Sequence, residues 1–167
     1  RAPNLLFINN GNGTFRDATV EYGLDRDYSF TTAAMFGDVN NDGYPDIYVG
    51  NYFKEFAGKL SLIDDAVIVN SKQMAKGYLL INKEGKYFED EYDAYGLTHK
   101  GFGFGGVFTD YDNDNDLDLI VNHDFGYKNT PNKLYENKYP EERFEDVSEK
   151  MRMNLPMNAM GTAVGDY

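Results

Sequence analysis

Two aspartate-rich segments, residues 38–46 and 110–118, carry oxygen-bearing side chains at the same relative positions, the first, third, fifth and ninth. Alternate side chains on a tight loop can converge on one point, and Ca²⁺ takes about six to eight oxygen ligands. Without a cation such crowding is costly, because like charges repel. The spacing predicts two calcium sites. The expected ligands are the side chains of Asp38, Asn40, Asp42 and Asp46 with the Tyr44 carbonyl, and the side chains of Asp110, Asp112, Asp114 and Asp118 with the Asp116 carbonyl.

The residues after each segment decide which kind of calcium loop this is. Asp, Asn and Gly also form ordinary solvated turns, but two turns at matched register favour the calcium interpretation. An EF-hand needs an acidic residue at position 12 between two helices, and that position holds Val49 or Val121. Residues 47–49 and 119–121 are β-branched or aromatic, which is typical of strands. The EF-hand and its helical relative, the dockerin, are therefore excluded, and the loops should connect β-strands.

A longer repeat surrounds these loops. Residues 5–17, 79–90 and 134–146 each read as a short strand, a turn, and a second strand carrying Phe then Asp, which is a hairpin signature. Short runs of small and apolar residues at 33–37, 105–109 and 161–165 precede each loop aspartate and predict an inner strand. Each unit of about 50 residues then holds four antiparallel strands, the pattern of a β-propeller blade. We expect an all-β fold.

The loop at 36–46 resembles the FG-GAP (VCBS) repeat of integrin-α-like β-propellers. The hairpin at 9–19 is similar to that of bacterial proteins related to cartilage acidic protein and UnbV. The resemblance implies that the loops bind Ca²⁺ between blade strands, at the ligands named above. Asn115 stands where the family has Gly, which Asn tolerates because it accepts a left-handed backbone. A third site would begin at Asp166 only if the chain or a neighbour completed its loop.

The repeat divides the chain into four parts. We expect an outer hairpin of an incomplete blade at 1–30, a blade at 31–97, a second blade at 98–155, and an inner strand of a next blade at 156–167. The first blade carries an insertion at about 52–76, with a short helix over 54–65 and a strand or continued helix over 66–69. Propellers typically need about four to eight blades to close. Either the chain is part of a longer propeller, or copies complete one another head-to-tail in a ring or filament.

Composition narrows the partners and the compartment. The net charge is −12 and no basic cluster is present to neutralise phosphates, so nucleic acid and anionic membranes are poor partners. No apolar run approaches the roughly 20 residues that span a bilayer. The chain has no cysteine, so disulfides and thiolate chemistry are excluded. Arg1 is not a natural start, so we expect a processed or trimmed N-terminus. Weak calcium modules suit calcium-rich surroundings, which favours an extracellular, cell-surface or periplasmic location.

No catalytic constellation is visible, so we expect a protein that is not an enzyme. The two histidines, His99 and His123, have no partner at catalytic spacing and are predicted to be surface or loop residues. We expect a calcium-stabilised structural, adhesion or recognition segment whose partners are other propeller blades or a protein or glycan ligand. One alternative is a self-assembling protomer of an extracellular ring or filament. Another is a lectin-like module, in which Tyr92, Tyr95 or Tyr127 would stack on sugars instead of packing between blades.

Overall fold

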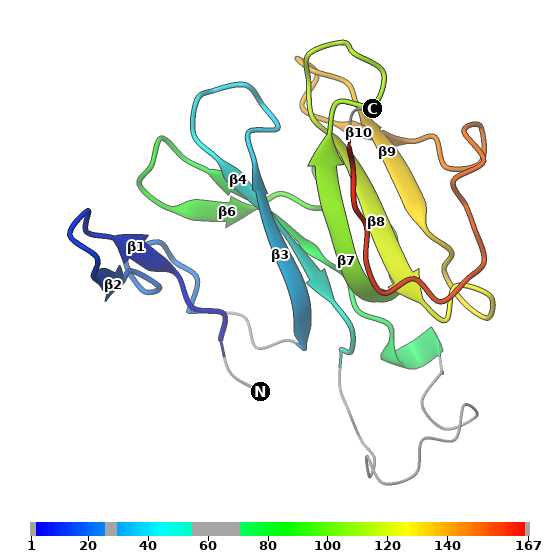
Figure 1. Cartoon of the computed structure of the whole chain (residues 1–167), viewed down its shortest axis with the longest axis horizontal. Helices are drawn as coiled ribbons and strands as arrows, with labels where there is room; N and C mark the ends of the chain where they lie inside the picture. The colour runs from blue at the N-terminus through cyan, green and yellow to red at the C-terminus, as the bar shows by residue number, and fades with distance from the viewer. Residues whose placement is uncertain (1–2, 26–29, 55–70, 166–167) are drawn as a thin grey trace, which may run out of the picture.

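The computed structural model describes residues 3–25, 30–54 and 71–165, and in this part of the chain the regular structure is almost entirely antiparallel β-sheet (Figure 1). The single helical element among these described residues is the short 3₁₀ turn η1 (Ser71–Gln73). The strands, in chain order, are β1 (Phe7–Asn9), β2 (Phe15–Asp17), β3 (Thr31–Gly37), β4 (Asp46–Asn51), β5 (Tyr78–Asn82), β6 (Phe88–Asp90), β7 (Phe102–Thr109), β8 (Asp118–Asp124), β9 (Lys133–Asn137) and β10 (Phe144–Asp146).

Eight of the strands form two four-stranded sheets with strands in sequence order, β3-β4-β5-β6 and β7-β8-β9-β10, and β1 and β2 form a separate hairpin. The two sheets share their register: Phe36 faces Ile47 in the first, and Phe108 faces Leu119 in the second. The predicted fold class is confirmed, since these are antiparallel four-stranded sheets of the kind found in propeller blades. The sheets described do not close into a barrel.

Each of the three hairpins ends in the same turn. The first aspartate after the second strand, or at its end, accepts a hydrogen bond from the backbone N–H two residues later: Asp17 from Thr19, Asp90 from Tyr92 and Asp146 from Ser148. Such local side-chain bonds favour turns over continued strand. The turn then closes through a residue with positive φ, which is Gly23, Gly96 or Arg152. The recurring Phe-x-Asp signature therefore marks where each hairpin stops.

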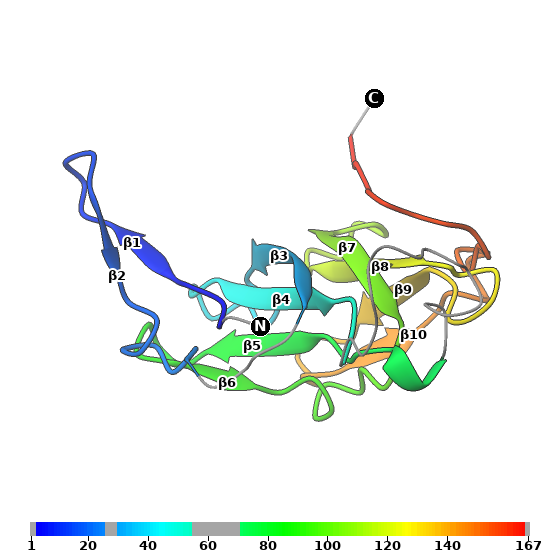
Figure 2. The same ribbon diagram turned by 90° about the horizontal axis from the view of Figure 1, so that it is seen from below.

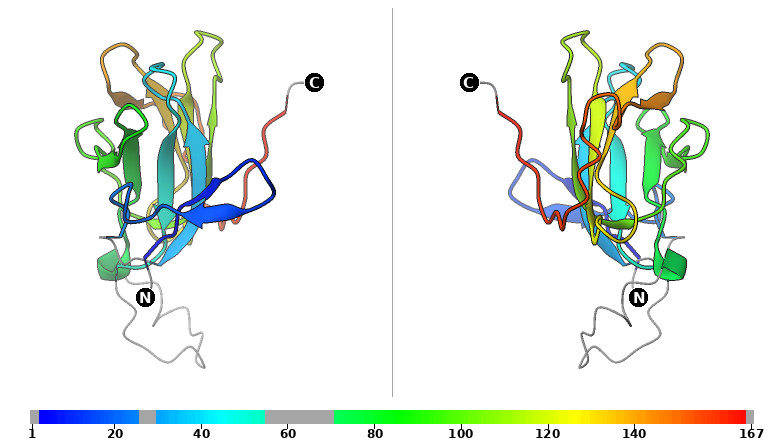
Figure 3. Two further views of the ribbon diagram at one scale, coloured as in Figure 1. Left: turned by 90° about the vertical axis from the view of Figure 1, so that its left-hand side faces the viewer. Right: turned by 90° about the vertical axis from the view of Figure 1, so that its right-hand side faces the viewer.

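The hydrophobic core lies between the two four-stranded sheets, which stand side by side in Figures 1 and 2. Tyr48, Leu79 and Ile81 of the first sheet pack with Leu119 and Val121 of the second, and all five are nearly inaccessible to solvent. Burial of apolar surface at roughly 25 cal/mol per Å² is what holds two such sheets together. The β1–β2 hairpin stands apart from this core, as the side views in Figure 3 show.

Two predictions about local structure are wrong. His123, which the sequence predicts on the surface or in a loop, lies on β8, where every residue except Ile120 is buried, and it is 1% exposed. His99 does lie in a loop, where it is partly buried. Residues 161–165 do not form a strand, because they have no strand partner in the described part of the chain. The blade boundaries proposed from the sequence stay predictions.

The predicted insertion at about 52–76 is only partly described. Its two ends meet: the N–H of Lys54 donates to the Gln73 carbonyl at 2.9 Å, and Phe53 and Met74 form an isolated bridge. The helix predicted over 54–65 lies outside the described residues except for Lys54. The segment 66–69 and Asp166, the start of the predicted third calcium loop, lie outside them as well.

Candidate metal centre

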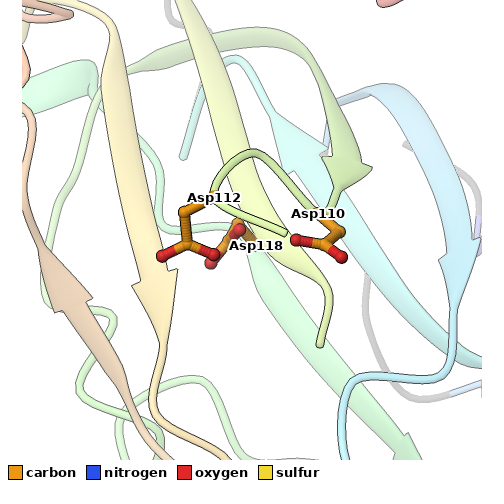
Figure 4. Close-up of side chains that lie close together, drawn as sticks. All are labelled: Asp110, Asp112 and Asp118. Carbon is orange, nitrogen blue, oxygen red and sulfur yellow. The ribbon is translucent and has the colours of Figure 1, made fainter. Parts of the chain in front are cut away.

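Three carboxylates of the loop between β7 and β8 converge. Asp110, Asp112 and Asp118 each offer an oxygen, and these oxygens all lie within 4.8 Å of one another. Figure 4 shows the three side chains around the loop, with those of Asp112 and Asp118 close together. Within the described ranges, no other group of three or more acidic or histidine side chains meets this criterion.

The fold of this loop depends on its own aspartates. Asp110 accepts hydrogen bonds from the N–H groups of Asp114 and Asn115, both at 3.1 Å. Asp114 in turn accepts one from the N–H of Asp116 at 3.2 Å. Asn115 has a φ of 72°, a left-handed backbone like that of Gly43 in the first loop, which agrees with the prediction that Asn is tolerated here.

The ninth position of the loop is the most tightly held. Asp118 is fully buried, and it accepts hydrogen bonds from the N–H of Tyr111 at 3.1 Å and the N–H of Asn137 at 2.8 Å. Asn137 lies at the end of β9, so the loop is tied to the third strand of its own sheet. These two backbone hydrogen bonds therefore hold the Asp118 carboxylate in place without help from a metal ion.

The first loop, between β3 and β4, repeats these bonds. Asp38 accepts from the N–H groups of Asp42 and Gly43, and Asp42 accepts from the N–H of Tyr44 at 2.8 Å. Asp46, also fully buried, accepts from the N–H groups of Val39 at 2.9 Å and Asn82 at 2.8 Å. Both loops lie along the same edge of the molecule in Figure 1.

The first loop differs from the second in how its side chains meet. Asn40 accepts from the N–H of Asp42 at 3.2 Å, and its amide donates to the Asp42 carboxylate at 3.0 Å. The predicted first-site acids Asp38, Asp42 and Asp46 do not form a converged group of the kind seen in the second loop. The predicted first site is thus a hydrogen-bonded loop with its ninth residue buried.

Burial and charge crowding raise the pKa values of the key carboxyl groups. Desolvation raises the pKa of Asp46 to about 6, with Asp42 and Asp38 adding repulsion. Desolvation raises the pKa of Asp118 to about 6 in the same way, with Asp112 and Asp114 adding repulsion. Backbone N–H donors oppose both shifts. Since one pKa unit is about 1.36 kcal/mol, a buried carboxylate here gains much from a neighbouring positive charge.

The donor set fits a hard divalent cation. It contains only carboxylate, carboxamide and carbonyl oxygens, which are the ligands that Ca²⁺ prefers. One oxygen of Asp116 is buried without a hydrogen-bond partner, and burial followed by repulsion from Asp114 raises the pKa of this residue. An uncompensated buried carboxylate is costly, so this side chain also favours a cation nearby.

Sequence reasoning missed two features of this centre. It assigned Asp116 through its carbonyl and did not foresee its buried side chain. It also passed over Asn82 and Asn137, whose N–H groups hold the ninth-position carboxylates. The signal was available, because an Asn ends the first strand of every hairpin, at Asn9, Asn82 and Asn137.

Comparison with known proteins agrees with this picture. A family model described as an FG-GAP-like repeat matches residues 1–49. Cartilage acidic protein 1 from Mus musculus is 27% identical, over 72% of this chain and 25% of its own length, and the Homo sapiens protein is 27% identical over 72% and 24%. The chain thus spans about a quarter of the length of these curated relatives. None of the helices in the described residues is long and apolar enough to cross a membrane.

Proposed function

We propose that this chain, which carries an FG-GAP-like repeat and is similar to cartilage acidic protein 1, is a calcium-binding, propeller-type repeat segment of an extracellular protein with a structural or recognition role. The observation that carries the proposal is the convergence of Asp110, Asp112 and the fully buried Asp118 on one side of a loop. The family match and the relatives support the extracellular repeat class, and the site supports calcium as the ligand.

When bound, Ca²⁺ would supply the positive charge that balances the clustered carboxylates. The chain's own residues do the rest. Asp118 and Asp46 present buried oxygens held by backbone N–H groups, and Asp110 and Asp38 shape the loops. Because the ligands come together only in the folded loops, ion binding should stabilise the folded chain, and the stabilisation should rise with the logarithm of calcium concentration.

A structural or recognition role is favoured over catalysis by what the histidines do. A His123 ring nitrogen, Nδ1, lies 2.8 Å from the Pro131 carbonyl and so carries the proton that it donates there. His99 stacks on Tyr135, and its Nδ1 lies 2.6 Å from the Tyr135 hydroxyl. Burial lowers the pKa of both rings, so both are neutral and hold packing in place.

The burial of two of the three candidate tyrosines argues against the lectin-like alternative. Of the three tyrosines that could stack on a sugar, Tyr92 and Tyr95 are buried in the core, and only Tyr127 is exposed. A single exposed ring gives little support for a sugar site. We therefore advance calcium-dependent structure as the one proposed function.

Calorimetric titration of Ca²⁺ into the chelator-treated chain tests this proposal. We expect two sites, and Asp112→Asn should weaken binding at one of them by about tenfold or more, because affinity depends on the number of charged ligands. Asp112→Asn removes one charge but keeps a side-chain oxygen that can still accept the backbone hydrogen bond from Asp114. The backbone bonds to Asp110 and Asp118 that shape the loop are left intact.

A matched control removes one negative charge elsewhere. Glu149 is exposed and lies in the turn after β10, outside both loops. Glu149→Gln should bind calcium as the wild type does. Absence of calcium binding in the wild type, or equal losses in Asp112→Asn and Glu149→Gln, would contradict the proposed function.

A further inference from the structure

A groove of about 770 Å³ separates the β1–β2 hairpin from the outer face of the β3–β6 sheet. Its walls are mainly apolar, and the residues that matter below are Leu6, Phe36, Ile47, Val49, Leu80 and Phe88. Phe36 is 59% exposed, although it lies on a strand within the sheet. Figure 2 shows the hairpin standing away from this sheet. Ile47 and Val49 are already nearly buried, and the exposed apolar surface of the groove comes from Phe36, Phe7 and Val20. An exposed apolar patch of this kind calls for an occupant.

The equivalent face of the second sheet is already covered. The two sheets share their register, so Phe108 corresponds to Phe36, Leu119 to Ile47 and Val121 to Val49. Leu119 and Val121 are completely buried in the core against the first sheet. The groove therefore continues, by one repeat, an interface that the molecule already contains.

Phe108 shows what this interface requires of its partner. It packs over Gly37 of the first sheet so closely that a Cβ on Gly37 would lie 2.7 Å from a ring carbon of Phe108. Only glycine leaves room for the ring at that point. By the same register, Phe36 needs a glycine on a strand packed against it.

The outer half of the groove is built like the outer half of the covered interface. The N–H of Phe144 donates to the Tyr95 carbonyl at 2.8 Å, and their ring centroids lie 6.1 Å apart. The N–H of Phe88 donates to the Tyr22 carbonyl at 3.1 Å, and those rings lie 5.9 Å apart. The turn after β2 is thus seated on β6 as the turn after β6 is seated on β10.

The groove and the covered interface differ at the inner edge of the hairpin, where the first hairpin strand meets an inner strand. In both four-stranded sheets the first hairpin strand pairs with an inner strand, β5 with β4 and β9 with β8. Among the described residues, β1 pairs only with β2. Its other edge presents backbone donors and acceptors that a strand would satisfy.

We propose that this groove is the docking site for the inner strand pair of a further FG-GAP-like repeat. The second strand of that pair adds to the free edge of β1, and its first strand places a glycine over Phe36. In the covered interface, the side-chain amide of Asn137 donates to the Val39 carbonyl of the neighbouring loop at 2.8 Å. The loop of the docked pair would offer an equivalent carbonyl to the side-chain amide of Asn82. This assignment rests on the proposed function only in treating the sheets as propeller-type blades, and it makes no use of calcium.

A strand pair fits the groove better than the other occupants do. A small apolar ligand would cover the wall but leave the β1 edge unpaired. A second copy of the chain has both of its inner pairs, β3–β4 and β7–β8, already built into sheets, and its segment 161–165 supplies at most one strand where the groove takes two. The occupant needs both an apolar face and a strand edge, and an unpaired inner strand pair has both.

The test uses the intact chain and a fluorescently labelled synthetic peptide of residues 31–51, which is itself an inner strand pair of this repeat type. Fluorescence anisotropy should show saturable binding in calcium and in chelator alike. A peptide with Gly37→Val should bind about tenfold more weakly or worse, because the added side chain occupies the space of the Phe36 ring.

Variants of the chain locate the binding. Phe36→Ser should weaken peptide binding by about tenfold or more, as expected when an aromatic anchor is removed. Phe15→Ser is the matched control, because Phe15 is 63% exposed on β2 and does not line the groove. It should bind the peptide like the wild type. Both phenylalanines are exposed in the free chain, so neither change should unfold it.

Hydrogen exchange gives a second readout on the same samples. Bound peptide should slow amide exchange at Phe7, whose N–H lies on the edge of β1 away from β2, whereas the N–H of Leu6 already donates to Thr19. The proposal is overturned if the wild type shows no saturable binding, or if Phe36→Ser and the Gly37→Val peptide bind normally. It is also overturned if light scattering shows a Phe36-dependent dimer, because a second copy would then fill the groove. Calorimetry with calcium, run separately, shows whether the proposed function fails.

Discussion

The backbone N–H of Asn137 donates a 2.8 Å hydrogen bond to the buried carboxylate of Asp118, which links the second Asp-rich loop to strand β9. Asn82 and Asp46 make the same bond, also at 2.8 Å, in the first sheet. In each sheet the last acidic residue of the loop is thus fixed by the third strand. The loop geometry belongs to the fold of the whole sheet and does not depend on the loop alone.

Replacing Asn137 with Ala should destabilise the chain. Its side-chain amide donates to the carbonyls of Val39 at 2.8 Å and Leu117 at 3.2 Å, and so joins the two sheets. Losing both bonds in a buried site should lower the free energy of unfolding by about 1–3 kcal/mol, measured by urea denaturation. Asn9 occupies the same repeat position but is exposed, so Asn9→Ala is the control and should be nearly neutral. Equal effects would contradict this role of Asn137.

Arg152→Gly should stabilise the chain. Arg152 has a φ of 57° in the turn where the other two hairpins have Gly23 and Gly96. A left-handed backbone costs a non-glycine residue about 1 kcal/mol, so the glycine variant should unfold at a higher urea concentration. Lys150, in the same turn without a positive φ, is the control, and Lys150→Gly should not be stabilising. A loss of stability in Arg152→Gly would show that its side chain matters more than its backbone.

Acidification should weaken the fold through His123. Burial lowers the pKa of this ring to about 4, below the usual value of 6.5. As the pH falls below 6.5 the unfolded chain takes up a proton that the folded chain refuses, so stability is lost down to about pH 4. Between pH 7 and pH 5 the loss from this group is about 2 kcal/mol.

The variant His123→Asn isolates this contribution. An Asn amide can donate to the Pro131 carbonyl but does not titrate, so the curve of unfolding free energy against pH should be flatter by that amount. The carboxylates are common to both proteins and cancel in the difference between the curves. Parallel curves would mean that His123 does not stay neutral in the fold.

Calcium affinity should fall as the pH is lowered. The carboxyl groups of Asp46 and Asp118 have pKa values of about 6 without a cation, so protons compete with calcium below that pH. Between pH 7.5 and pH 5 the apparent dissociation constant should rise about tenfold per site, measured by calorimetry. A raised pKa also means that the metal-free chain loses stability as the pH rises from 3.8 through 6. Bound calcium should remove this loss of stability. A calcium affinity that does not change with pH would contradict the predicted competition between protons and calcium.

Much of the fold could be predicted from the sequence because the repeat is explicit. The Phe-x-Asp hairpins and the Asp-rich loops recur at nearly constant spacing, and the strands form around them. Alternation of polar and apolar residues did not reveal His123, because β8 is buried on both faces and a histidine there gives no periodic signal. Residues 161–165 have strand-like composition, but a strand also needs a partner, which local sequence cannot supply.

The candidate site was predictable in part for the same reason. Spacing alone placed Asp110, Asp112 and Asp118 together, as they are in the structure. It could not show that Asp46 and Asp118 are buried beneath a strand from the hairpin, because that contact spans 36 residues in the first sheet and 19 in the second. The buried oxygen of Asp116 likewise depends on tertiary packing.

Thermal unfolding at increasing calcium concentration tests the central claim most directly. The wild type should melt at progressively higher temperature, since each site filled at a hundredfold excess over its dissociation constant adds about 2.7 kcal/mol. The double variant Asp42→Ala, Asp114→Ala, which removes one acid from each loop, should show little or no such rise. A wild type whose melting temperature ignores calcium, or a double variant that gains as much as the wild type, would contradict calcium binding at these loops.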